Sequence, residues 1–403
     1  MDRKALEYTR DHYNRHANQY VDTKEALHAR ATGASAPLKK FHNTIKRKLI
    51  DRFASGADSL LDLACGRGGD IWKWIDFKIK YVKGIDLSPG EVAEARQRYE
   101  EACGKHRQTP LQTRCEFLDT PNLGLQEWKE AQQYDVVTCM FALHYFFVSE
   151  AALKQFFHNV SINLKDGGYF IGTVPDGKRI NECIRSSKVY NSPMLKIEAR
   201  WEGAPNVFGS AYVCAIGDTV TGGEKGTEGS LEYLVYRNVL QGVAAQYGLK
   251  PVLQYNDAEL EGMFDAADQG QVLKHFAPRF PESDPSLAKA SALFTAFAFQ
   301  KTVGDVTLPE DSKKHEVIAA VAVEKEKEKE KGGGLKRKQE ELGSSGGGGG
   351  CDEKAAAEIA AVADDGDKEG VEDDGAKPKS KYKRPQIRRK AAPQPPQDPP
   401  TTS

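Results

Sequence analysis

The distribution of hydrophobic and polar positions divides the first 303 residues into a helical start and a longer stretch of alternating strands and helices. In residues 1–57, apolar positions recur at helical spacing, for example at Phe41, Ile45 and Leu49, and bases occupy the outer positions. This pattern predicts an N-terminal pair of amphipathic helices. From residue 59, short apolar runs alternate with amphipathic ones, which predicts an α/β fold with a doubly wound, mainly parallel sheet.

Seven strands and four helices are expected in all after residue 57. The runs that predict strands are short, apolar and bounded by turn residues, at 59–65, 81–88, 113–120, 134–147 (running into a loop), 164–176, 249–256 and 291–301. The runs that predict helices are 71–77, 91–104, 149–164 with Ser149 as N-cap, and 232–248 closed by Gly248. Periodicity weakens at about 180–230, where Gly and Pro interrupt the chain, so we expect an inserted lobe of short strands and loops there.

Composition predicts a domain boundary near residue 303. The residues before it contain all four Trp, all seventeen Phe and fourteen of the fifteen Tyr, enough apolar surface for one sizeable core. Tyr382 is the only aromatic residue after it. A stretch rich in Gly, Lys, Glu and Pro cannot offset backbone ordering at about 1 to 2 kcal/mol per residue. We therefore expect one folded domain over 1–303 and a disordered charged tail over 304–403.

Charge is segregated within this tail, although the formal net charge of the chain is only -1. Residues 352–374 carry ten acids and two lysines, and residues 377–390 carry eight bases and no acid. The seven Cys include no CxxC pair, which argues against a disulfide framework and a zinc site and fits a reducing compartment. The chain has no signal-like apolar segment and no apolar run of about 18 residues. These features predict a soluble protein that is neither secreted nor bound to a membrane.

The most informative stretch is the turn DLACGRGGD at 62–70, between the first expected strand and a helix. Its glycines let the backbone approach a ligand closely, and Asp86 ends the next strand. A dinucleotide site and a sulfonium-cofactor site both fit glycines followed by an acid about twenty residues on. Asp62 and Asp70 favour the sulfonium cofactor, because Asp70 would repel a phosphate at the helix start and both acids suit an ammonium group.

This turn resembles the first motif of the class I S-adenosylmethionine-dependent methyltransferases, in which an acid precedes alternating glycines. The resemblance implies that Asp86 accepts hydrogen bonds from the ribose hydroxyls of S-adenosylmethionine and that Asp119 faces the adenine. Asp119 by itself could equally be a turn residue. Cys65 and Cys139 are interpreted as small buried side chains rather than nucleophiles.

Six separated segments narrow the resemblance to the mRNA cap guanine-N7 methyltransferases. They occur in order between residues 11 and 301: DHYN at 11–14, FHNTIKRKLI at 41–50, LDLACGRGGDIWKW at 61–74, FALHYFF at 141–147, GGYFIGTVPD at 167–176 and EYLVY at 232–236. The combination is more specific than any one motif, and the tail lies outside it. The resemblance implies methyl transfer from S-adenosylmethionine to N7 of the guanine cap of RNA.

The resemblance also implies two sets of site residues. The set that would line the cofactor pocket, with a lysine for the cofactor carboxylate, is Lys46, Asp62, Ala64, Gly66, Asp86, Asp119, Met140 and Tyr145. The set that would hold the cap is His42, Asn43, Arg67, Lys73, Arg98, His144, Glu232 and Phe294. The three bases Arg67, Lys73 and Arg98 would face the triphosphate, which needs positive charge, and the others would surround the guanine.

Simpler interpretations stand beside several of these roles. Lys73 and Arg98 could belong to a solvated helix face, which is the default in a chain with 29% charged residues. His144 and Tyr145 could be an ordinary loop pair. Glu232 is expected to open a helix with its carboxylate toward the substrate, but the same position could serve only to stabilise the helix dipole.

Four of these residues depart from the family pattern. The family usually has Gly, Gln, Asn and Tyr, respectively, at the positions of Ala64, Met140, His42 and Phe294. The departures bear on cofactor affinity and cap geometry more than on the class of reaction.

Guanine N7 has an exposed lone pair and no proton to remove, so no catalytic acid or base and no metal is expected. The rate would come from holding N7 in line with the methyl sulfonium group. Two other functions remain open for the same fold: methylation of another RNA or a small molecule, and a non-catalytic role as an RNA-binding scaffold.

Basic blocks in the tail bear on where the protein acts in the cell and on which partners it binds. Residues 336–338 and 377–390 resemble nuclear import or nucleic-acid patches, which predicts a nuclear protein. The expected partners are 5′-capped RNA and, through the tail, RNA polymerase or other capping enzymes.

Overall fold

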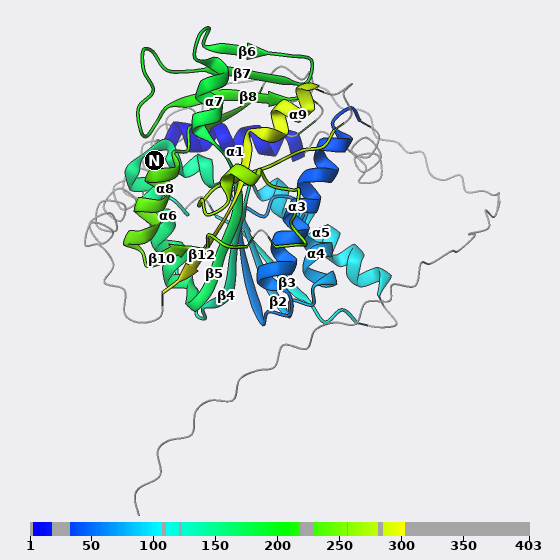
Figure 1. The fold of residues 1–403 in the computed structure, drawn as a ribbon. Coiled ribbons are helices and arrows are strands. Elements are labelled where there is room, and N and C mark those ends of the chain that lie inside the picture. Colours follow the sequence, from blue (N-terminus) through cyan, green and yellow to red (C-terminus); the bar gives the residue numbers. More distant parts are fainter. Residues whose placement is uncertain are drawn as a thin grey trace, which may run out of the picture. The chain divides into compact units, whose positions relative to one another are not determined.

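The computed structural model describes residues 3–17, 33–106, 110–120, 123–217, 219, 229–255, 257–280 and 285–302 (Figure 1). These residues belong to the first of two compact units of the chain, Met1–Gln339. The charged tail expected at 304–403 lies outside the described residues. Its disorder and the boundary at 303 therefore stay predictions.

A mainly parallel β-sheet forms the centre of the fold. Its strands are β1 (Ser59–Leu63), β2 (Tyr81–Asp86), β3 (Arg114–Asp119), β4 (Tyr134–Met140), β5 (Leu164–Pro175), β10 (Leu249–Pro251), β11 (Lys274–His275) and β12 (Phe294–Lys301). The order is β10-β12-β5-β4-β1-β2-β3, with the two-residue β11 paired to β12. β1 to β5 are parallel, whereas β12 is antiparallel to β5 and β10 to β12. The seven predicted strands are confirmed, and β11 is an eighth that the sequence did not indicate.

Helices cover both faces of this sheet. They are α1 (Arg3–Ala17), α3 (Ala36–Ala54), α4 (Ile71–Asp76), α5 (Pro89–Lys105), α6 (Glu150–Asn163), α7 (Gly177–Ile184), α8 (Arg237–Gln246), α9 (Pro285–Ala292) and the short 3-10 helices η1 (Leu143–Val148) and η3 (Ala266–Asp268). Figure 1 shows α3, α4 and α5 on one side of the sheet and α6 and α8 on the other. Successive strand residues face opposite sides, so Leu60 and Leu61 belong to different apolar clusters. The doubly wound fold is confirmed.

Side-chain caps set where two of these helices begin. The hydroxyl of Ser149 accepts the N–H of Ala152 at 3.1 Å, which confirms the predicted N-cap of α6. The hydroxyl of Ser88 accepts the N–H of Glu91 at 3.2 Å at the start of α5. The predicted N-terminal pair of helices is present as α1 and α3.

Residues 189–233 contain a second sheet, in the range expected for an inserted lobe. Its antiparallel strands are β6 (Val189–Asn191), β7 (Leu195–Ala199), β8 (Ala211–Ile216) and β9 (Ser230–Tyr233). The predicted helix start at Glu232 is wrong, because Glu232 lies on β9 opposite Tyr212, and α8 begins at Arg237. The segment LEYLVY is rich in aromatic and branched residues, so pairing with β8 decides its conformation.

Candidate functional site

The turn after β1 has the backbone that its glycines favour. Gly66 and Gly68 have φ angles of 52° and 68°, which glycine adopts without strain. A Cβ on Gly68 would lie 2.5 Å from Cδ1 of Ile71 and 3.2 Å from Cβ of Ala95, so packing also favours glycine there. Ala64 has a φ of 69°, a left-handed conformation that costs an L-residue roughly 1 to 2 kcal/mol. Ala64 is therefore a strained position within this turn.

The carboxylate of Asp86 holds this turn from the end of β2. It accepts the N–H of Gly66 at 2.8 Å and the N–H of Ser88 at 2.9 Å. Burial raises the pKa of Asp86, against the lowering effect of these N–H groups. Asp119 on β3 is its partner in register and is exposed. The two acids therefore lie at the carboxyl ends of neighbouring strands, where ligands bind in this class of fold.

Asp62 is a buried acid near the end of β1, only 3% exposed. Thr138 on β4 donates its hydroxyl to Oδ1 of Asp62 over 2.5 Å. Burial, with the nearby charge of Asp70, raises the pKa of Asp62 to about 7. A cation brought to this place would favour the ionised carboxylate.

Asp70 lies between two lysines at the start of α4. The Nζ atoms of Lys46 and Lys73 each lie 2.6 Å from an oxygen of Asp70. Burial alone would raise the pKa of Asp70, but the two ammonium groups hold it below its usual range. Lys73 also donates to Oδ1 of Asn43 at 3.2 Å and to the carbonyl of Gly69 at 3.1 Å. The repulsion that Asp70 would exert on a phosphate is therefore offset by two neighbouring lysines.

Both arginines predicted to face the triphosphate, Arg67 and Arg98, lie against carboxylates of α5. Nε of Arg67 lies 2.8 Å from Oε1 of Glu91 and 3.2 Å from Oε2 of Glu94. Arg98 pairs with Glu94 one turn away on the same helix. Burial raises the pKa of Glu91 to about 7 despite the charge of Arg67. A phosphate would compete with these carboxylates for the guanidinium groups.

Glu232 and His144 come together from β9 and η1. Oε2 of Glu232 lies 3.9 Å from Nε2 of His144, and both side chains are buried. The hydroxyls of Tyr212 and Ser230 donate to the two oxygens of Glu232 over 2.8 and 2.7 Å. Neither ring nitrogen of His144 has a hydrogen-bond partner among the described residues. Burial lowers the pKa of His144, so an oriented carboxylate lies beside a neutral ring that can still form hydrogen bonds.

His42 and Phe294 belong to one aromatic cluster. The ring of His42 stacks on Phe141 and meets Phe294 edge to face, each with centroids 5.2 Å apart. Its Nε2 lies 2.9 Å from the hydroxyl of Ser291. Burial lowers the pKa of His42 to about 3, so the ring is neutral. Two of the departures from the family pattern therefore lie in contact with each other.

Helix α1 contacts the site through residues that the sequence left without a role. The hydroxyls of Tyr13 and Tyr145 lie 2.6 Å apart, and the hydroxyl of Ser88 donates to Oδ1 of Asn14 over 2.5 Å. The motif DHYN at 11–14 was the only signal for this contact, and it indicated a family rather than a function. Met140 is buried at the end of β4.

An open groove of about 490 Å³ lies between α3, α4 and α5. Its lining includes Asn43, Lys73 and Arg98 from the predicted cap set, together with Gly68 and Gly69 of the turn. The structure therefore brings these three predicted residues to one groove. Arg67 turns instead toward Glu91.

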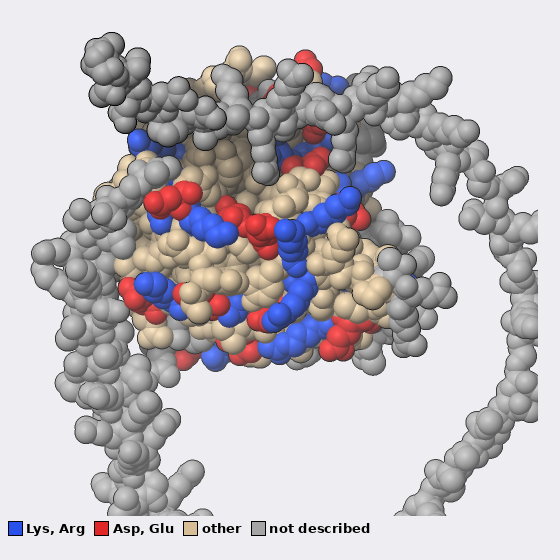
Figure 2. Space-filling view, turned by 90° about the horizontal axis from the view of Figure 1, so that it is seen from below, with Lys and Arg blue, Asp and Glu red and all other residues tan. Residues whose placement is uncertain are grey.

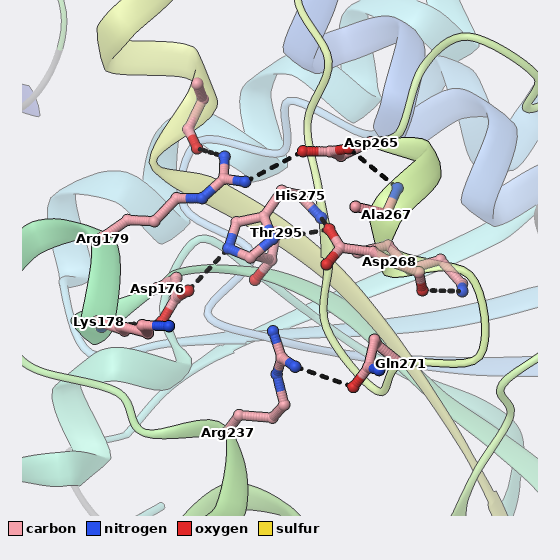
Figure 3. Close-up of polar contacts among 12 residues, drawn as sticks. Asp176, Lys178, Arg179, Arg237, Asp265, Ala267, Asp268, Gln271, His275 and Thr295 are labelled. Carbon is pink, nitrogen blue, oxygen red and sulfur yellow. Dashed lines mark hydrogen bonds and ion pairs between the residues drawn. The ribbon is translucent and has the colours of Figure 1, made fainter.

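A buried polar network lies outside the predicted sites (Figure 3). Nε2 and Nδ1 of His275 on β11 lie 2.7 Å from carboxylate oxygens of Asp176 and Asp268, respectively. Burial alone would lower the pKa of His275, but the hydrogen bonds to the two carboxylates raise it. Asp176 follows β5 and caps α7, so the network joins α7 to β11 beside the strand that begins at Phe294.

Neither a metal site nor an activated thiol at Cys65 or Cys139 is found among the described residues. Among them, no group of three or more His, Cys, Asp or Glu side chains could hold a metal ion. Burial raises the pKa of the Cys65 and Cys139 thiols well above the usual value, as expected of inert side chains. No helix of the described ranges is long and apolar enough to span a bilayer.

Several known proteins are similar to this chain. The sequence profile of the mRNA (guanine-N(7))-methyltransferase domain matches residues 2–340. The mRNA cap guanine-N(7) methyltransferase 1 of Arabidopsis thaliana is 32% identical over 268 residues, which cover 62% of this chain and 67% of that protein. The protein of the same name from Oryza sativa is 34% identical over 190 residues, 46% of this chain and 50% of its own length. The mRNA cap guanine-N(7) methyltransferase of Candida glabrata is 29% identical over 317 residues, 72% of each chain.

Solved structures are more distant. An S-adenosylmethionine-dependent methyltransferase from Clostridium acetobutylicum aligns with a TM-score of 0.41 and 14% identity, over 69% of this chain and 98% of that chain. An alignment with this TM-score carries no further information about the fold or the function of the chain.

Proposed function

The chain belongs to the mRNA (guanine-N(7))-methyltransferase domain family, and we propose that the groups described above hold its two substrates. As a member of this family, it transfers a methyl group from S-adenosylmethionine to N7 of the guanine cap of RNA. The cofactor would bind at the carboxyl ends of β1, β2 and β3, and the cap would bind between β9, η1 and α3.

Three acids fit the polar groups of S-adenosylmethionine, which supplies an electrophilic methyl group when bound. Asp62, whose charge burial disfavours, gains from an ammonium group nearby. Asp86 already accepts two N–H groups and has further lone pairs for the ribose hydroxyls. Asp119 lies next to Asp86 in register and is exposed, and it would face the adenine.

The other predicted cofactor residues would complete this pocket. Lys46 offers an ammonium group for the cofactor carboxylate, and Asp70 orients it over 2.6 Å. The backbone of Ala64 and Gly66 turns with positive φ, which leaves room for close approach of a ligand. Met140 and Tyr145 would form the remaining wall, the latter held by its contact with Tyr13.

Glu232 and His144 fit the cap guanine. The Watson-Crick edge of guanine carries the donors N1–H and N2–H, which one carboxylate accepts as a pair while N7 stays free. The hydroxyls of Tyr212 and Ser230 orient the carboxylate for this role. The neutral ring of His144 can donate to guanine O6.

The remaining predicted cap residues would flank the guanine. His42, Phe294 and Asn43 would form the wall beside the guanine, since His42 and Phe294 touch and Asn43 follows in the chain. Lys73 and Arg98 would bind the triphosphate where they line the groove. Arg67 would join them when a phosphate replaces Glu91 as its partner.

No described side chain needs to act as an acid or base in this scheme. N7 attacks through its lone pair, so no proton has to be removed. The buried pair Glu232 and His144 would orient guanine, and α1 would help to exclude water through Tyr13. Alignment and electrostatic stabilisation would supply the rate.

We also propose that the protein acts in the nucleus. Support comes from its place in mRNA cap formation and from the basic blocks at 336–338 and 377–390. Polymerase or another capping enzyme would bind the charged tail. Redistribution of the protein to the cytoplasm when both basic blocks are replaced would support import, and an unchanged location would contradict it.

The observation that carries the cap assignment is buried Glu232, held by two hydroxyls beside a histidine whose ring nitrogens have no hydrogen-bond partner among the described residues. Methyl transfer to GpppG, GTP and uncapped RNA, compared side by side, tests it. We expect transfer to GpppG, weaker transfer to GTP and none to uncapped RNA. Equal transfer to uncapped RNA would exclude cap recognition, and cofactor binding with no turnover on capped RNA would favour a scaffold.

A further inference from the structure

We propose that the groove between α3, α4 and α5 binds the RNA chain that follows the cap, and that exposed Trp72 stacks on one of its bases. The inference rests on the proposed function, because the cap triphosphate would enter the groove at Lys73 and Arg98. It extends that function to nucleotides that the cap pocket cannot reach.

Positive charge dominates the lining of the groove. Its one acid, Glu101, is outnumbered by five bases, Lys40, Arg47, Lys73, Arg98 and Lys105. Three of these bases already pair with Asp76, Asp70 and Glu94. Within the part of the chain that the structure describes, no ion pair is found for the other two, Lys40 and Lys105. These two ammonium groups are therefore available to phosphates.

Figure 2 shows Lys and Arg intermixed with Asp and Glu over the face seen from below. Exposed pairs such as Lys80 with Asp58, at 2.6 Å, largely cancel each other's charge. Intermixed charge gives little net attraction for RNA, whereas the groove gathers five bases against one acid.

The bases of the groove are spaced along two facing helices. Helix α3 lines the groove with two bases, Lys40 and Arg47, and with the amide of Asn43 between them, at positions i, i+7 and i+3, respectively. Arg98 and Lys105 of α5 line it seven residues apart, about 10 Å along the helix axis. A chain of phosphates leaving the triphosphate site at Arg98 would therefore meet Lys105 two helical turns further on.

Trp72 provides an aromatic surface within this groove. It is 43% exposed, whereas its neighbours Ile71 and Trp74 are buried. Nζ of Lys105 lies 5.7 Å from the centroid of its ring, and the ring of His106 lies 6.2 Å away. An exposed aromatic ring beside cations is the arrangement on which single-stranded RNA stacks, independently of sequence. Trp72 adds little to the core, so binding explains its exposure.

The test compares GpppG with a capped RNA of about ten nucleotides as substrates of the full chain. Trp72→Ala should raise the KM for capped RNA about 5- to 150-fold and leave the kinetics on GpppG unchanged. The double variant Lys40→Ala/Lys105→Ala should reduce the salt slope of uncapped RNA binding by about 1.4, two contacts at about 0.7 each. Lys80→Ala removes an exposed lysine at the start of β2 and should change neither value.

The inference is wrong if the groove variants behave like Lys80→Ala on capped RNA. It is also wrong if they lose activity equally on GpppG and capped RNA, because the residues would then belong to the cap site. If the wild-type protein methylates neither substrate, the proposed function fails. The salt slope of RNA binding still reports on the groove in that case.

Discussion

Thr138 on β4 donates its hydroxyl to Asp62 on β1 over 2.5 Å, where the two residues are partners in register. Burial favours the protonated form of this carboxyl group, and the hydrogen bond from Thr138 partly opposes that effect. The net result is that the pKa of Asp62 is raised to about 7. The proposed cofactor site therefore contains an acid that titrates near neutral pH and would gain from a bound ammonium group.

Cofactor affinity should consequently fall as the pH decreases. The ammonium group of the cofactor would bind the ionised form of Asp62. Below pH 7 the carboxyl group of Asp62 is mostly protonated, so it must lose a proton before the cofactor binds. We expect S-adenosylhomocysteine to bind about tenfold more weakly at about pH 6 than at about pH 8, measured by calorimetry. Asp62→Asn should remove most of this dependence. An equally steep pH profile in that variant would show that another group titrates.

Replacing Ala64 by Gly should stabilise the protein. The substitution relieves roughly 1 to 2 kcal/mol of left-handed backbone strain and loses about 0.5 to 1 kcal/mol to the greater freedom of glycine when unfolded. The free energy of unfolding in urea should rise by up to about 1.5 kcal/mol. Ala93→Gly, at an exposed position within α5, should lower it by about 0.5 to 1 kcal/mol. A matching loss in both variants would show that Ala64 is not strained.

The network around His275 should make stability depend on pH. The two carboxylates raise the pKa of His275 in the folded protein above its unfolded value of 6.5. The protonated His275 therefore stabilises the fold fully below pH 6.5, and this stabilisation is lost as the pH rises through the folded-state pKa. Burial alone would raise the pKa of Asp268, but the hydrogen bonds from His275 lower it. The stability that ionised Asp268 contributes is therefore present above its unfolded pKa of 3.8 and is lost in stronger acid.

His275→Gln tests this network. The variant should unfold more easily by about 1 to 3 kcal/mol between about pH 4 and about pH 6.5, and the difference should shrink at higher pH. Urea unfolding at several pH values measures it. A difference that is constant over the whole range would mean that the protonated ring adds nothing.

The catalytic domain should be complete at Lys301. Lys301 ends β12 and is buried, and its Nζ donates to the carbonyls of Ser161 and Leu164 at 2.9 and 2.8 Å. A chain shortened to end there should fold and methylate GpppG like the full chain. Loss of this activity, measured at equal protein concentration, would place the boundary further toward the C-terminus.

Periodicity and glycine signals were sufficient for the parallel sheet and for the turn at 62–70. They failed where a tertiary contact decides the outcome. Glu232 was expected on a helix because its segment is apolar with helical spacing, yet pairing with β8 makes it a strand. The contact of Tyr13 with Tyr145, and that of His275 with two acids, join residues far apart in the chain, which local pattern cannot indicate.

The position of Glu232 on the lobe still supports its proposed role in guanine recognition. On β9 its carboxylate is oriented by neighbouring hydroxyls and lies beside His144, so it does not depend on a helix dipole. The dipole alternative therefore loses its structural basis, and recognition of guanine becomes the central claim about this residue.

The most direct measurement of that claim is kcat/KM of Glu232→Gln on GpppG. Losing a paired, desolvated carboxylate contact should cost roughly 2 to 4 kcal/mol, or about 30- to 1000-fold in kcat/KM, while S-adenosylhomocysteine binding and unfolding in urea stay near normal. Glu198→Gln, which changes an acid on β7 of the same lobe that pairs with Arg200, should leave kcat/KM unchanged. A Glu232→Gln protein that retains more than about half of the wild-type efficiency would contradict guanine recognition by this carboxylate.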